Sequence, residues 1–315
     1  MKAQKLIASA FALSIALTCI TVFSQDTPLP APDTATQSPA KNPRAGYTPL
    51  ADGYKQTSVN KTGTMTTNAA VDNTTPSAAT AYKTFTAGSG DTLFKFTLSS
   101  HGNIIRLESP AGFEHLASGS IGEGYIVSMN TASGVVRYFD AGFSEGSGCT
   151  GNLRSWSPTV FETNPTANGT TLTRDTCDGA WRLTQTFLRN VTNHELTVTM
   201  TLKNLTGFNY TGVTLDRYFD GDLDNDNSDD RFSRTYDAVA GQDSTFDNLS
   251  LTAISFSVPH STAIHTFAGW DETVTNQASI ASPTGAGDFV GRVSYSLGTI
   301  NASAQKVVKV LYKRQ

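Results

Sequence analysis

The chain has 315 residues, enough for one large domain or two small ones, with a formal net charge of -4 and only 16% charged residues. It has no basic run, which argues against nucleic acid or an anionic membrane surface as a partner. Thr, Ser, Asn and Gly are abundant, which is typical of turn-rich extracellular β-proteins. It is not the composition of a helical cytosolic enzyme.

Residues 1–24 have the pattern of a secretory signal peptide. Lys2 and Lys5 give a positive start, a mostly apolar run follows, and a cleavage site lies before Gln25. Two alternatives remain: an uncleaved anchor, because the apolar run reaches the lower limit of a spanning helix, and lipidation at Cys19. We expect a secreted protein, extracellular or periplasmic, with no membrane span after signal cleavage.

Residues 25–82 are predicted to be a disordered spacer. Prolines crowd the first half, and the second half is rich in Thr, Asn, Ala and Ser with hardly a large aliphatic residue. Such a segment cannot bury enough apolar surface to offset the entropy lost on ordering. We interpret it as a link between a cell surface and a folded domain, with a plain tail as the alternative.

Residues 83–315 are predicted to form a single β-sandwich domain. Short stretches that alternate apolar and polar residues recur between turn residues, which is typical of half-buried strands. The clearest hairpin joins residues 181–189 to residues 195–203, with Trp181 in the core. No sustained helical periodicity appears, so the fold class we expect is all-β: a large antiparallel two-sheet sandwich with little helix.

Two cysteines remain if Cys19 leaves with the signal peptide. Cys149 and Cys177 are natural disulfide partners in an oxidising compartment, and two free thiols are the alternative. A bridge closing a loop of that length contributes about 3–4 kcal/mol in the chain-entropy model.

An acidic stretch, residues 220–230, contains six aspartates in eleven residues. Strand-forming residues flank it on both sides, so we expect a hairpin that continues the meander around an acidic turn. So many carboxylates repel one another unless a counter-charge lies among them. Calcium, which takes six to eight oxygen ligands, is the ion this pattern predicts. The expected ligands, which follow a D-x-D-x-D-x-x-x-D spacing, are Asp222, Asp224, Asp226 and Asp230. Asp220 is a further candidate.

The spacing is not that of an EF-hand, because position twelve of the loop is Arg231 or Ser233 rather than Glu. It resembles instead the hairpin calcium loops of integrin-type propeller blades, with Asn227 in place of their usual glycine. Asn tolerates the left-handed conformation better than most residues. A solvated acidic turn without an ion is the alternative.

Sugar chemistry or sugar binding would need other side chains. Glu123 lies between two glycines, so we expect an exposed loop carboxylate and name it as a candidate catalytic residue, with a simple turn residue as the alternative. Trp156 and Trp270 stand in turn-like surroundings and are candidate sugar-binding platforms. For both, a place at the edge of the core is the alternative.

Three stretches, residues 172–188, 196–204 and 217–222, resemble a loosely defined group of secreted bacterial all-β proteins of unknown function. Long alternating strands followed by Leu-Lys-Asn-Leu-Thr also resemble the supersandwich of aldose-epimerase-like and carbohydrate-active proteins. The paired histidines that epimerases use find no motif match here, so the resemblance implies a fold but no catalytic residue.

The function we expect is that of a secreted or cell-surface, calcium-stabilised β-sandwich with a binding or structural role rather than an enzyme. A carbohydrate or a cell-surface polymer is the expected partner. The alternative is a carbohydrate-active enzyme of the supersandwich type, either a glycoside hydrolase or epimerase-like. A structural subunit that self-associates is a third reading.

Overall fold

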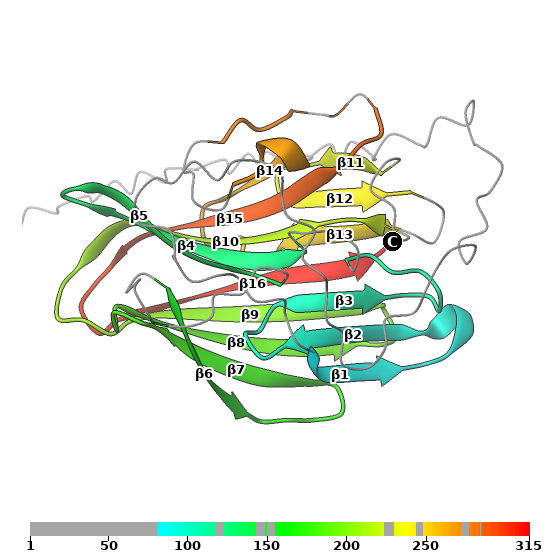
Figure 1. Ribbon diagram of the computed structural model, residues 1–315, viewed down its shortest axis with the longest axis horizontal. Coiled ribbons are helices and arrows are strands. Elements are labelled where there is room, and N and C mark those ends of the chain that lie inside the picture. The colour runs from blue at the N-terminus through cyan, green and yellow to red at the C-terminus, as the bar shows by residue number, and fades with distance from the viewer. Residues whose placement is uncertain are drawn as a thin grey trace, which may run out of the picture. The chain divides into compact units, whose positions relative to one another are not determined.

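The computed structural model describes residues 81–116, 122–142, 149, 155–223, 230–243, 248–271, 277–281, 283 and 285–315 (Figure 1). Its regular structure is β-strand apart from two short 3-10 turns, η2 (Gly90–Thr92) and η4 (Phe267–Gly269). The all-β prediction is therefore confirmed. The expected signal peptide and almost all of the expected spacer lie outside the described residues. Within the described part of the chain, no helix is long and apolar enough to cross a membrane.

One layer of the fold is an eight-stranded sheet in which every neighbouring pair is antiparallel. Figure 1 shows these strands side by side from β6 to β11. In spatial order they are β11 (Arg231–Arg234), β12 (Ala238–Gln242), β13 (Asn248–Ala253), β16 (Gln305–Arg314), β9 (Glu195–Asn204), β8 (Trp181–Asn190), β7 (Gly169–Thr176) and β6 (Trp156–Thr163).

The facing layer is built from two smaller antiparallel sheets, and β3 of one lies beside β4 of the other. The five-stranded sheet contains β14 (His260–Thr266), β15 (Phe289–Ile300), β10 (Tyr210–Asp220), β4 (Glu123–Thr131) and β5 (Gly134–Ala141). The three-stranded sheet contains β1 (Ala81–Ala87), β2 (Phe94–Ser99) and β3 (Ile104–Glu108).

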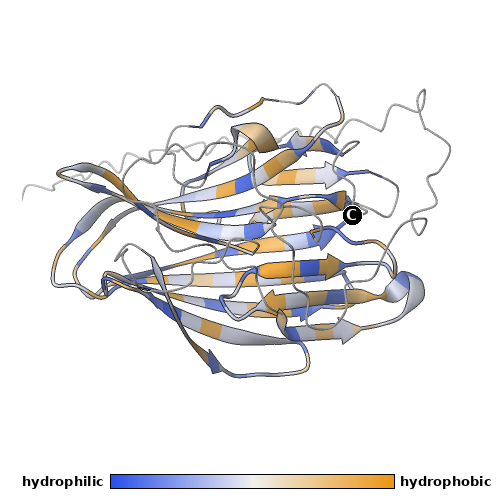
Figure 2. Cartoon of the chain, in the orientation of Figure 1, coloured by the Kyte–Doolittle hydropathy of each residue, from blue (hydrophilic) through white to orange (hydrophobic). Residues whose placement is uncertain are grey.

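The hairpin of β8 and β9 shows why these segments are strands. Hydrophobic and polar residues alternate along them, as the colours of the strands show in Figure 2. Leu196, Val198, Met200 and Leu202 are all fully buried, whereas the threonines between them lie on the outer face. Burying one such side chain stabilises the fold by about 1.5–3 kcal/mol. The predicted hairpin is confirmed, and Trp181 lies in the core.

The main core lies between the two layers. Its residues come from the inner faces of all three sheets, including Val198 of β9, Val127 of β4 and Phe96 of β2. A second, smaller apolar cluster lies on the opposite, outer face of the five-stranded sheet and consists of Ile126, Ala141, Tyr218, Trp270 and Val290. The five-stranded sheet therefore buries side chains on both faces.

The acidic stretch joins two different sheets, so the expected hairpin is wrong. β10, before the stretch, pairs with β4 and β15, whereas β11, after it, pairs with β12. Two strands joined by an acidic turn would have paired with each other in a hairpin. Here the chain crosses from one layer to the other, and Asp220, Asp222 and Asp230 of the acidic stretch are buried.

The predicted disulfide between Cys149 and Cys177 is confirmed, with an S–S distance of 2.08 Å. Cys177 directly follows β7, and its N–H donates to the carbonyl of Ser155 at 2.7 Å. The bridge therefore fastens the segment that enters β6 to the end of β7.

Candidate functional site

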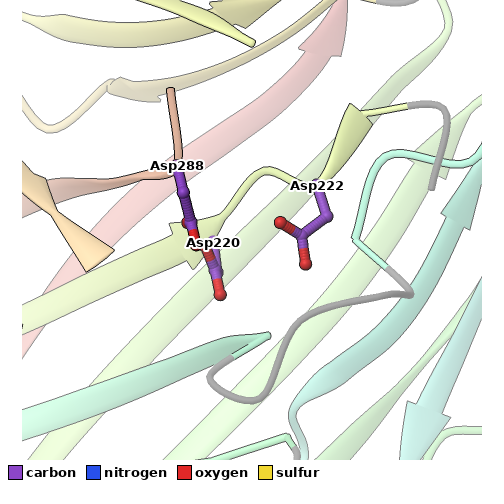
Figure 3. A group of neighbouring side chains, drawn as sticks. All are labelled: Asp220, Asp222 and Asp288. Carbon is purple, nitrogen blue, oxygen red and sulfur yellow. The ribbon is translucent and has the colours of Figure 1, made fainter. Parts of the chain in front are cut away.

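Three aspartates from separate parts of the chain converge beside the crossover (Figure 3). Asp220 is the last residue of β10, Asp222 lies two residues further on, and Asp288 immediately precedes β15. Oxygen atoms of their three carboxylates all lie within 4.8 Å of one another. Figure 3 shows Asp220 beside Asp288, with the carboxylate of Asp222 turned toward them. We call these three residues the aspartate cluster.

Backbone hydrogen bonds hold the distant Asp288 in the cluster. The N–H of Gly287 donates to the carbonyl of Asp230 at 2.9 Å, which ties this segment to the end of the acidic stretch. The carbonyl of Asp288 itself accepts from the N–H of Phe267 at 3.0 Å, at the start of η4. Asp288 is thus fixed from both sides by the main chain.

The first part of the crossover is fixed by packing. Leu223 is fully buried in the main core, and its N–H donates to the carbonyl of Gly221 at 2.8 Å. A Cβ atom on Gly221 would lie 2.9 Å from the rings of both Phe219 and Phe232. Only glycine fits there, because a side chain would have to displace one of the rings. The backbone between Asp220 and Asp222 is therefore closely packed against these two rings.

The cluster concentrates negative charge where water is scarce. Asp220 and Asp222 are almost completely buried, and Asp288 is half-buried. Burial, and then the negative charge of Asp222, raise the pKa of Asp288 to about 7. Among the described residues, Oδ1 of Asp288 has no hydrogen-bond partner. Both causes favour the protonated form of Asp288 over the charged one.

The aspartate cluster includes only part of the predicted ligand set. Asp220 and Asp222 belong to it, while Asp230 is buried nearby and its carboxylate accepts from the N–H of Leu223 at 3.3 Å. The other two predicted ligands, Asp224 and Asp226, lie outside the described residues. Sequence analysis missed Asp288, which follows the turn-like Gly285-Ala-Gly287 far along the chain and belongs to no local motif. Three carboxylates offer the hard oxygen ligands that calcium requires.

Glu123 is not the exposed loop residue that we expected. It is the first residue of β4, is fully buried, and forms an ion pair with Arg217 of β10. Its carboxylate also accepts from the hydroxyl of Tyr312 at 2.6 Å and from the N–H of Ile104 at 2.7 Å. Burial and the charge of Glu123 raise the pKa of Tyr312 well above its ordinary value, so the phenol stays a donor. Among the described residues, this carboxylate is thus paired with protein groups from three different strands.

Trp156 is also buried, which overturns its candidacy as an exposed platform. Its ring lies 5.3 Å from that of Tyr125 and 5.9 Å from the guanidinium of Arg174. Arg174 in turn forms a buried ion pair with Asp140. Although burial alone would raise it, the pKa of Asp140 is held below its usual range by Arg174 and by His101, whose Nδ1 lies 3.1 Å away.

Trp270 is buried as well, on the outer face of the five-stranded sheet. Its ring packs 4.7 Å from Tyr218, 5.1 Å from His265 and 5.9 Å from the guanidinium of Arg292. Because side chains two residues apart share a sheet face, Tyr218 and Asp220 point the same way from β10. Trp270 therefore packs on the same sheet face toward which Asp220 points.

No family model matches the chain, and neither does the sequence of any curated protein. Solved structures share its fold. A bacterial glucoamylase complexed with acarbose matches with a TM-score of 0.51 and 15% identity, over 84% of this chain and 36% of the glucoamylase. A putative aldose 1-epimerase from Escherichia coli K12 matches with a TM-score of 0.41 and 11% identity, over 74% of this chain and 99% of the epimerase. A galactose mutarotase-like protein from Clostridium acetobutylicum matches with a TM-score of 0.42 and 8% identity, over 74% of this chain and 96% of that protein.

The chain thus spans about a third of the length of the glucoamylase that it matches. At these identities the likeness concerns the fold alone. The glucoamylase match, which has a TM-score above 0.5, agrees with the expected supersandwich-like fold.

Proposed function

We propose that this chain is a secreted, calcium-stabilised β-sandwich with a binding role. The observation that carries the proposal is the convergence of Asp220, Asp222 and Asp288, brought within 4.8 Å of one another from separate elements. Holding three carboxylates together in partly buried surroundings costs free energy unless a proton or a cation neutralises them. Calcium suits this position because its coordination is flexible and uses oxygen ligands.

The extracellular location rests on two features. The pattern of residues 1–24 is that of a signal peptide, and the disulfide between Cys149 and Cys177 suits an oxidising compartment. Extracellular calcium is abundant, so a site of moderate affinity is filled there without a tight cage of ligands.

A thermal melt of the full chain, with millimolar calcium and then with a chelator, tests the proposal. Calcium at a hundredfold excess over its dissociation constant adds about 2.7 kcal/mol, which raises the melting temperature by about 5–10 °C. Asp222→Asn should remove this rise. Identical melting curves with calcium and with chelator would contradict the calcium claim.

A second function, glycoside hydrolysis, is favoured by one specific observation. Asp288, with its pKa raised to about 7, stands beside other carboxylates at a separation near the roughly 5 Å that retaining glycosidases use. In that reading Asp288 is the proton donor and Asp220 or Asp222 the ionised partner. Glycan hydrolysis that survives chelation and is lost in Asp288→Asn would favour this enzyme over the binding role.

A further inference from the structure

An exposed aromatic surface lies at a second place, on the turns that lead into β12 and β14, both labelled in Figure 1. Tyr236, in the turn between β11 and β12, is 69% exposed, and Phe256, in the turn between β13 and β14, is 66% exposed. Both rings lie near the ring of His260, at 4.8 Å and 6.4 Å between centroids. We call Tyr236 and Phe256 the aromatic platform.

The turn that carries Tyr236 is rigid. The N–H of Thr235 donates to the carbonyl of Ala238 at 2.8 Å, and the N–H of Ala238 donates to Oγ1 of Thr235 at 3.0 Å. The carbonyl of Asp237 accepts from the N–H of Ala253 at 2.7 Å. Tyr236 is therefore held outward on a fixed backbone, and a ligand that covers its ring does not have to order the turn.

The turn that carries Phe256 is fixed in a similar way. The N–H of Val258 donates to the carbonyl of Ser255 at 2.9 Å, and Oγ of Ser255 accepts from the N–H of Lys309 at 2.9 Å. His260 joins the two turns, since its Nδ1 lies 3.0 Å from the carbonyl of Val258 and its Nε2 lies 2.7 Å from the carboxylate of Asp237. The buried imidazole thus sets the spacing between the exposed rings.

Beside Tyr236 the surface opens into a pocket of about 390 Å³, lined by Arg234, Thr235, Tyr236, Ser261, Thr262 and Ala281. Two backbone carbonyls hold the Arg234 side chain, which donates from Nε to Ala281 at 3.0 Å and from Nη1 to Thr262 at 2.8 Å. Within the described residues, neither Nη2 of Arg234 nor the hydroxyl of Tyr236 donates a hydrogen bond. Donors therefore remain for a ligand in this pocket.

We propose that the aromatic platform and the adjoining pocket bind a neutral carbohydrate chain. A sugar ring offers an apolar C–H face that packs on an aromatic ring, and hydroxyls at its edge that meet hydroxyl and guanidinium groups. The pocket volume lies within the range of about 300–1,000 Å³ that is usual for small-ligand sites. This inference names the partner of the binding role proposed above and so rests on it.

A protein partner fits this surface less well. A stable protein interface buries about 1,200 Å² or more, with an apolar centre and a polar rim. Here the ring of Tyr236 stands beside a small pocket whose lining consists mainly of hydroxyl-bearing side chains and one arginine. The exposed carboxylate of Asp237 adds an acceptor for sugar hydroxyls at the platform's edge.

Affinity electrophoresis of the full chain tests the inference, in native gels that contain soluble starch, laminarin, hydroxyethyl cellulose or dextran. At least one of these polysaccharides should retard the protein. Tyr236→Ala and Phe256→Ala should each weaken that affinity about tenfold, and Tyr236→Phe should weaken it less because the ring remains. Phe208→Ala is the matched control, because Phe208 is 74% exposed on a different turn and should leave the retardation unchanged.

Retardation by none of the four polysaccharides would overturn the inference, and so would equal retardation of both alanine variants and the parent chain. A parent chain that self-associates in light scattering, and that Tyr236→Ala renders monomeric, would make this surface an interface between copies and would also overturn it. The calcium melt of Tyr236→Ala separates the two proposals. Its calcium response should match that of the parent chain, because the platform shares no residue with the aspartate cluster.

Discussion

Asp222 and Asp288 place their carboxylates within 4.8 Å of each other, although one follows β10 and the other precedes β15. The negative charge of Asp222 adds to burial in raising the pKa of Asp288 to about 7. This relationship links the stability of the fold to pH. If the proposed calcium ion binds in the cluster, it should relieve the same repulsion that a proton on Asp288 relieves.

The pH dependence of stability follows from that shift. The pKa of Asp288 is higher in the folded protein than its ordinary value of 3.8, so the folded state binds the proton more tightly than the unfolded state. The stability gained from this proton is present below about pH 4 and is lost as the pH rises through about 7. Without calcium, the contribution of Asp288 should therefore decline over this window. The rise in melting temperature on adding calcium should be larger at pH 8 than at pH 5.5, as calorimetry with and without chelator can measure.

Asp288→Asn should make the protein more stable than the parent when calcium is absent. The amide keeps the shape of the side chain but removes one negative charge, so in chelator at pH 8 the variant should be about 1 kcal/mol more stable than the parent. Added calcium should then stabilise it little. Asp91→Asn, which removes an exposed aspartate on η2, is the control and should change neither response. An Asp288→Asn protein that is less stable than the parent in chelator would contradict the account.

The aspartate cluster could not be predicted in full from the sequence, because it depends on pairing between distant strands. The alternating residues of β8 and β9 predict a hairpin because facing and burial follow directly from local periodicity. The residue pattern on either side of the acidic stretch is that of a strand in both cases, whether the two strands pair with each other or belong to different sheets. The choice between sheets depends on distant partners, such as the pairing of Phe219 with Gly291, and this same long-range pairing brings Asp288 into the cluster.

Glu123 illustrates a different failure of prediction. Two flanking glycines suggested an exposed loop, but a Cβ on Gly124 would lie 2.3 Å from the carbonyl of Asp140 and 2.5 Å from the hydroxyl of Tyr218. Glycine there permits close packing of strands rather than exposure. Buried ion pairs such as Glu123 with Arg217 leave no local pattern, because each partner is read separately as a surface charge.

Glu123→Gln should therefore destabilise the protein rather than alter a ligand's turnover. The variant leaves the buried guanidinium of Arg217 without its anion, which costs about 3–5 kcal/mol. Glu195→Gln is the control, because its ion pair with Lys313 is partly exposed and contributes at most about 1 kcal/mol. Urea denaturation of the two variants measures the difference. Equal stability of both variants would mean that the buried pair is not what fastens β4 to β10.

Removing the disulfide should also lower stability. Cys149 and Cys177 are separated by 28 positions in the sequence, and a bridge of that span stabilises the fold by about 3–4 kcal/mol in the chain-entropy model. The double variant Cys149→Ser with Cys177→Ser should lose that amount in chemical denaturation while keeping its response to calcium. Loss of the calcium response as well would show that the bridge and the aspartate cluster depend on each other.

The most direct measurement is an anomalous difference map from crystals of the protein grown in calcium. We expect one peak among the carboxylates of Asp220, Asp222 and Asp288, with oxygen ligands at about 2.3–2.6 Å. We also expect the peak to be absent from crystals of Asp288→Asn. A map of the parent protein with no peak at the cluster, at a calcium concentration that saturates any site of millimolar affinity, would show that the aspartate cluster does not bind calcium.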